Sequence, residues 1–176
     1  MAVYSYKKIT PELGSGVFVS ESADVIGRCK IGDNVSIWFN TVLRGDVANI
    51  LVGQNTNIQD NSTLHITDNL DLEIGESVTI GHGVTLHSCK VGNFSLIGMG
   101  SVVLDKVSVG DFSLVAAGSV LPPGKVYGSK KLIRGNPARE IRDLREEEVE
   151  ALKESARHYV DRKNEYLDRS VVDRIN

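Results

Sequence analysis

Aliphatic residues recur every six positions along most of this chain, separated by polar and small residues. Clear copies of the repeat are IGDNVS, VGQNTN and IGESVT. The repeated positions are Leu13, Val19, Val25, Ile31, Ile37, Leu43, Val52, Ile58, Leu64, Ile74, Ile80, Leu86, Val91, Ile97, Val103, Val109, Val115 and Leu121. A short strand with inward aliphatic side chains, followed by a corner where Gly or Asn accepts a positive φ, forms one side of a triangular coil. Coils of about eighteen residues then stack as parallel strands roughly 4.8 Å apart.

One outward column of side chains follows from this spacing. Successive coils carry a leucine at the same place: Leu43, Leu64 and Leu86. The spacing exceeds six after the first two leucines, and we expect the extra residues to form loops at corners without disturbing the stack. The residues after the leucines then lie one strand apart: Arg44, His65 and His87. Two imidazoles this close can bind one cation, because zinc–nitrogen bonds are about 2.0–2.1 Å long.

His82 falls on a different face of the predicted coil. It follows Ile80 by two positions and therefore shares a column with Asp60. A corner separates it from the other two histidines, so one chain is not expected to bring all three together. A symmetric trimer would do so, because a face of one subunit can meet a different face of the next. The spacing therefore predicts a metal site at a subunit interface.

The C-terminal part of the chain has a different pattern. We expect a single domain over 1–176, with the β-helix over 13–126 and a helix over 143–168. Asp143 is a candidate N-cap, with Glu146 as its capping partner. Apolar residues then recur at helical spacing, and we expect this face to pack on the outside of the β-helix: Val149, Leu152, Ala156 and Val160.

Composition removes several classes of function. Charged residues make up 24% of the chain and the net charge is −3, which gives no indication of nucleic-acid or membrane-surface binding. No stretch has the apolar length of a signal peptide or a membrane span. Cys29 and Cys89 are expected to pack as small apolar residues rather than form a disulfide. The expected location is the cytoplasm.

Six segments form a recognisable set of motifs: LRGD (43–46), NIQD (57–60), TLH (63–65), IGHGVTLHSCKVG (80–92), IGMGS (97–101) and RGNPAREIR (134–142). Together they resemble the motifs of the γ-class carbonic anhydrases. The resemblance implies a mainly β fold, a left-handed parallel β-helix of hexapeptide repeats with a C-terminal α-helix. It also implies a homotrimer in which His65 and His87 of one subunit and His82 of its neighbour bind zinc. The column argument reaches the same three ligands independently.

The resemblance also suggests roles for five neighbouring residues. Arg44 and Asp46 would form an ion pair between subunits. Gln59 would hydrogen-bond the metal-bound hydroxide, and Asp60 would orient His82 or cap a corner. Tyr159 matches a tyrosine near the family's site, although helical spacing could equally make it a packing residue.

The implied reaction is attack of a metal hydroxide on carbon dioxide to give bicarbonate. The chain departs from the family pattern where a proton must leave the site. Val47 and Ala48 follow LRGD where the family has a glutamate, and the insertion after the TLH motif is short. Asp68, Asp71 and Glu73 are the acidic residues of this insertion that could accept the proton instead.

Two other functions fit the same repeat. The first is an acyl or acetyltransferase, which shares the β-helix but needs only one histidine as a general base. The second is a non-catalytic scaffold that keeps the metal for structure. Three imidazoles and a water suit iron and cobalt as well as zinc, so the sequence leaves the metal open.

Overall fold

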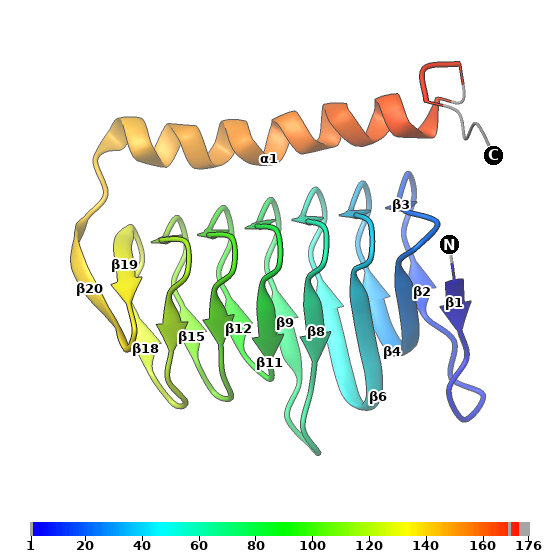
Figure 1. The fold of residues 1–176 in the computed structure, drawn as a ribbon, viewed down its shortest axis with the longest axis horizontal. Coiled ribbons are helices and arrows are strands. Elements are labelled where there is room, and N and C mark those ends of the chain that lie inside the picture. The colour runs from blue at the N-terminus through cyan, green and yellow to red at the C-terminus, as the bar shows by residue number, and fades with distance from the viewer. Residues whose placement is uncertain (1, 169, 173–176) are drawn as a thin grey trace.

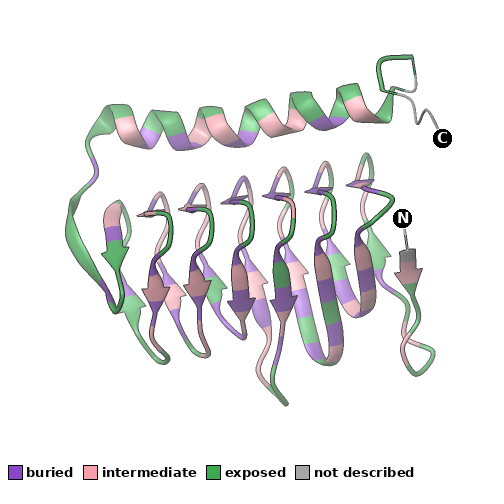
Figure 2. Ribbon diagram, in the orientation of Figure 1, coloured by how far each residue is buried: buried purple, intermediate pink, exposed green. Residues whose placement is uncertain are grey.

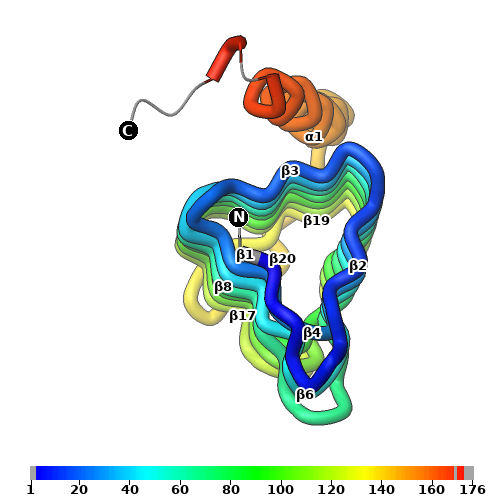
Figure 3. The backbone as a smooth tube through the Cα atoms, turned by 90° about the vertical axis from the view of Figure 1, so that its right-hand side faces the viewer, coloured from blue at the N-terminus to red at the C-terminus, as the bar shows by residue number. Residues whose placement is uncertain are grey.

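The computed structural model, which describes residues 2–168 and 170–172, is a three-sided solenoid with one long helix beside it (Figure 1). Viewed end-on, the coils superpose as a triangle (Figure 3). Strands on each side pair in parallel with those of the next coil. The fold is the predicted left-handed β-helix, with about 7 turns and one C-terminal helix.

The pair face carries two of the histidines and consists of β1 (Ala2–Tyr4), the first parts of β4 (Asp24–Ile31) and β6 (Val42–Val52), β8 (Thr63–His65), β11 (Thr85–His87), β14 (Val102–Val103) and β17 (Val120–Leu121). The helix face consists of β3 (Phe18–Val19), β5 (Ser36–Ile37), β7 (Asn57–Ile58), β10 (Thr79–Ile80), β13 (Leu96–Ile97), β16 (Leu114–Val115), β19 (Lys131–Gly135) and the antiparallel β20 (Ala138–Asp143). The glycine face consists of β2 (Glu12–Leu13), the last parts of β4 and β6, β9 (Leu72–Ile74), β12 (Lys90–Val91), β15 (Ser108–Val109) and β18 (Val126–Tyr127).

The repeated aliphatic residues form the interior of the solenoid. Leu43, Leu64 and Leu86 pair in register and are 0% exposed, which confirms the predicted stack. Beyond the predicted range, Tyr127 and Ile133 continue the buried column. The extra residues after Leu43 bulge at a corner, as predicted. They lie within β6, where β4 pairs with Val42–Gly45 and again with Ile50–Val52, and the register shifts between these two stretches.

Asparagine at corners and glycine on one face let the coils stack closely. Asn40 and Asn61 adopt φ values of 58° and 61°, as expected for tight corners, and hydrogen-bond each other at 3.3 Å. On the glycine face, a Cβ atom at Gly53 would lie 2.5 Å from the backbone of Gly75. The side chain is therefore excluded by the next coil rather than by a special φ angle.

Helix α1 (Glu146–Leu167) runs along the helix face as predicted, with its buried side toward the coils (Figure 2). Its buried residues include Val149, Leu152 and Ala156. The predicted cap at Asp143 is wrong, because Asp143 ends β20 and Arg145 is the N-cap. Glu148 completes this turn by accepting a 2.9 Å hydrogen bond from the backbone N–H of Arg145.

Cys29 and Cys89 are buried and carry free thiols, as predicted. Among the residues described, no helix has the length and apolar character needed to cross a bilayer.

Candidate metal centre

His65 and His87 lie side by side on the pair face. Their backbones pair in register, and Arg44 pairs with His65 on the other side, which confirms the predicted outward column. Nδ1 of His65 is 3.2 Å from Nε2 of His87. Bonds of about 2.0–2.1 Å in a tetrahedral zinc site would separate two ligand nitrogens by about 3.3 Å. The two imidazoles are therefore spaced as a metal would require.

A carboxylate contacts the outer nitrogen of each of these rings. Oδ1 of Asp46 lies 3.1 Å from Nε2 of His65, and Oδ1 of Asp105 contacts Nδ1 of His87. A neutral imidazole has one N–H and one lone pair, so donation to a carboxylate leaves the lone pair on the opposite nitrogen. With both rings donating outward in this way, two lone pairs would face each other, and a cation bound between them would relieve their repulsion. Carboxylate–histidine–metal arrangements of this kind are common in metalloproteins.

His82 has the same kind of partner on the helix face. Its Nδ1 lies 2.8 Å from Oδ2 of Asp60, and the side chain is 49% exposed. The column is as predicted, because β7 and β10 pair in register just before these residues. Within the described part of this single chain, no three His, Cys, Asp or Glu side chains are grouped to hold a metal. The candidate ligands are therefore divided into two half-sites.

Two further candidate residues lie on the side of His82: Gln59 directly follows β7 on the helix face, and Tyr159 of α1 lines a cavity with Asp60. Gln59 is 5% exposed, and its Nε2 donates to Oδ1 of Asn57 at 3.1 Å. Tyr159 packs edge-on against Trp38, with ring centroids 5.7 Å apart. Burial, and after it the negative charge of Asp60, raises the pKa of the Tyr159 phenol.

A cavity of about 350 Å³ lies between the solenoid and helix α1. Asp60 and Trp38 line it from the solenoid, and Tyr159 and the exposed His158 line it from the helix. The cavity thus adjoins the carboxylate that contacts His82. The catalytic roles assigned to Gln59, Asp60 and Tyr159 remain predictions, now placed together on one face.

Arg44 and Asp46 contact each other within one chain. Partial burial alone would raise the pKa of Asp46, but hydrogen bonds from Arg44 and His65 outweigh it and lower the pKa below its usual range. Asp46 therefore stays ionised, with one oxygen toward each partner. The expected ion pair between subunits remains a prediction.

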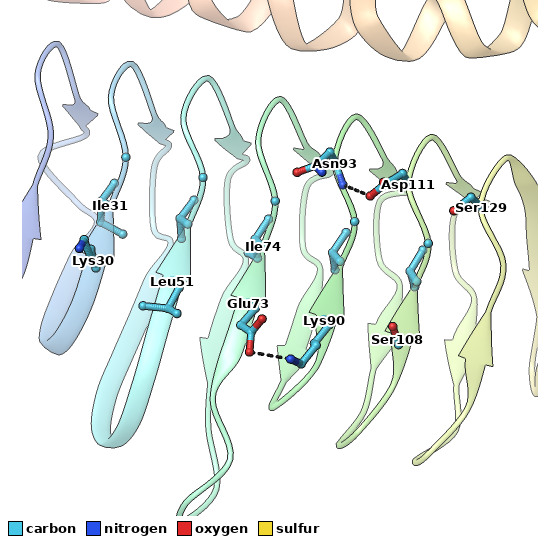
Figure 4. Close-up of a pocket in the computed structure, with 18 residues that line it drawn as sticks. Lys30, Ile31, Leu51, Glu73, Ile74, Lys90, Asn93, Ser108, Asp111 and Ser129 are labelled. Atoms are coloured by element: carbon cyan, nitrogen blue, oxygen red, sulfur yellow. Dashed lines mark hydrogen bonds and ion pairs between the residues drawn. The ribbon is translucent and has the colours of Figure 1, made fainter.

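Two of the three candidate proton acceptors already have partners. Both oxygens of Asp71 accept hydrogen bonds from Asn49, and Glu73 pairs with Lys90 at 2.8 Å on the glycine face (Figure 4). Glu73 therefore lies on a different face from the histidine pair. Asp68 is exposed in the short loop after His65, and Val47 is 43% exposed.

A groove of about 670 Å³ also lies on the glycine face (Figure 4). Its lining includes Glu73, Lys90 and one glycine from each of several successive coils, but none of the histidines. The groove is separate from both half-sites.

Asp105 is the site residue that sequence reasoning missed. Leu86 pairs with Val103, so Asp105 lies one coil beyond His87 and one residue further along. The coil length alone could have identified it, since an acidic residue about eighteen positions after a histidine lies beside it in such a solenoid. Asp46 reaches His65 from the preceding coil instead, two residues beyond Arg44, which pairs with His65.

Several known proteins are similar to this chain in sequence or in structure. No protein-family model matches the chain. It is 48% identical to protein YrdA of Escherichia coli over 170 residues, covering 93% of this chain and 92% of the relative. It is 42% identical over 163 residues to the mitochondrial γ carbonic anhydrase 2 of Arabidopsis thaliana, covering 86% of this chain and 56% of the relative. The crystal structure of a hexapeptide transferase family protein from Anaplasma phagocytophilum superposes with a TM-score of 0.89, at 42% identity, covering 94% of this chain and 98% of that one.

The β-helix fold is thus shared with the Anaplasma phagocytophilum protein, which this chain covers almost completely. The chain belongs to the γ-carbonic-anhydrase-like family of hexapeptide-repeat proteins.

Proposed function

We propose that this protein is a homotrimeric metalloenzyme of γ-carbonic anhydrase type that hydrates carbon dioxide to bicarbonate. One observation carries the proposal: Nδ1 of His65 and Nε2 of His87 face each other at 3.2 Å, with a carboxylate behind each ring. Because His82 has its own carboxylate on another face, it would complete the ligand set of the neighbouring subunit. Zinc is the preferred metal, and iron and cobalt also suit three imidazoles.

Exposed apolar residues around both half-sites support a subunit contact there. Phe39 and Met99 flank the Asp60–His82 column and are 37% and 58% exposed. On the pair face, Ile26 and Leu104 flank the column of Arg44 and the two histidines, and both are only partly buried. Contact between two different faces gives a ring when the rotation closes, and three subunits would form three sites.

In this proposal the residues have separate tasks. A metal in the site would supply a Lewis acid that acidifies a water molecule. The imidazoles would direct their lone pairs to it, and Asp46 and Asp60 would keep His65 and His82 in the required tautomer. Gln59 and Tyr159 would line the substrate side from the neighbouring subunit. The buried free thiols suit a reducing compartment, and we propose the cytoplasm.

Metal analysis combined with a hydration assay tests the proposal. We expect about one zinc per chain and an assembly about three times the 19.2 kDa chain mass. Chelation should abolish hydration, and added zinc should restore it. A protein that purifies without metal, or whose hydration rate is unchanged by chelation, would overturn the proposal. Chelation that dissociates the trimer of a protein with no turnover would indicate a structural metal.

Acyl transfer is the second candidate, favoured by the likeness to the hexapeptide transferase family protein. Such chemistry needs one general base rather than three converging histidines. Acetyl transfer that survives both His65→Ala and His82→Ala would favour it over the metalloenzyme.

A further inference from the structure

We propose that Asp105 is a positioning residue for the metal centre, which fixes the tautomer and orientation of His87. This inference rests on the proposed metal site and adds to it a residue outside the motifs. Oδ1 of Asp105 contacts Nδ1 of His87, and the carboxylate side chain is 41% exposed. The carboxylate therefore reaches the ring from the solvent side, while Nε2 points toward His65.

The corner that carries Asp105 is held by the coils on both sides. The N–H of Gly124 donates to the carbonyl of Asp105 at 2.8 Å. The N–H of Lys106 donates to the carbonyl of Ser88, the residue after His87, also at 2.8 Å. The backbone that carries the Asp105 carboxylate is thus hydrogen-bonded to the backbone that carries the His87 ring. A carboxylate fixed in this way can select one ring orientation without movement of the backbone.

Asp105 has a more specific task than Asp46. Asp46 divides its oxygens between Arg44 and His65, so its replacement would disturb two interactions at once. The carboxylate of Asp105 contacts His87. Loss of this contact should leave the ring free to turn or to carry its proton on Nε2, where a proton blocks metal binding. Replacement of Asp105 is therefore a clean test of ligand positioning.

Zinc affinity measured by competition with a chromophoric chelator is the first readout. We expect Asp105→Asn to weaken zinc binding about 10- to 100-fold, and Asp105→Leu to weaken it further. Glu73→Gln is the matched control, since it also changes an ion-paired carboxylate to an amide but on the glycine face. Its zinc affinity should equal that of the unchanged protein.

Nitrogen-15 NMR of the histidine rings in the metal-free protein is the second readout. We expect the proton of His87 on Nδ1, and a mixture of tautomers in Asp105→Asn, with the thermal midpoint of the metal-free variant unchanged. Zinc bound through the three histidines with full affinity in both Asp105 variants would overturn this inference and leave the proposed function intact. If the unchanged protein binds no zinc, the proposed function fails, and with it any role of Asp105 toward a metal.

Discussion

Complementation between two inactive variants tests whether the metal site is shared by two subunits. His82→Ala leaves the pair face intact, and the double variant His65→Ala/His87→Ala leaves the other half-site intact. Neither variant alone can build a complete site, because every interface would lack at least one ligand. In a mixed trimer, a complete site forms wherever the pair face of the first variant meets the His82 face of the second.

The geometry determines how many sites return. A ring of three subunits has three interfaces. In a mixed ring, only one of them joins the pair face of the His82→Ala chain to the His82 face of the double variant, whether the ratio of the two chains is 2:1 or 1:2. Each mixed trimer should therefore regain about one site of three, and hydration per trimer should recover to about a third. The result does not depend on how the two chains partition during assembly.

Co-expression with two different affinity tags isolates the mixed trimers. Zinc is then counted by elemental analysis, and hydration is measured on the same sample. Two differently tagged copies of the His82→Ala chain form the control and should bind no zinc at the site. Mixed trimers that remain metal-free, or a His82→Ala protein that keeps its full zinc content, would refute the shared site.

The buried leucine stack and the ion-paired start of helix α1 should both contribute measurably to stability. Leu64→Ala removes a fully buried side chain between two other leucines and should lower the free energy of unfolding by about 3–5 kcal/mol in urea titrations. Val126→Ala, at a side chain 77% exposed, should change it little. Hydrogen bonds from Arg142 and then from the Arg145 backbone hold the pKa of Glu148 well below its usual range. Their stabilisation is present above the unfolded pKa of about 4.3 and declines as the pH falls toward the folded value, so the gap in urea midpoint between the natural chain and Glu148→Gln should narrow in acid. A gap that stays constant with pH would contradict this assignment.

Helix α1 shows where local signals in the sequence mislead. Helical periodicity located the buried residues, because Val149, Leu152 and Ala156 all face the coils. The cap was misassigned because Asp143 has the right residue type but belongs to β20, where it pairs with Lys131. The competing strand pairing is a tertiary interaction, and residue type alone cannot reveal it.

The coil, its interior and the division of the histidines between two faces could all be predicted from the repeat. A period of six with a fixed inward position leaves little freedom, so the pairing of His65 with His87 and of His82 with Asp60 followed from counting residues. The atoms that contact each other are set by the folded structure. It turned the ring nitrogens of His65 and His87 toward each other, engaged Asp71 and Glu73 elsewhere, and brought Asp105 to His87. These contacts depend on side-chain orientation and on diagonal neighbours in the next coil, which a repeat pattern does not specify.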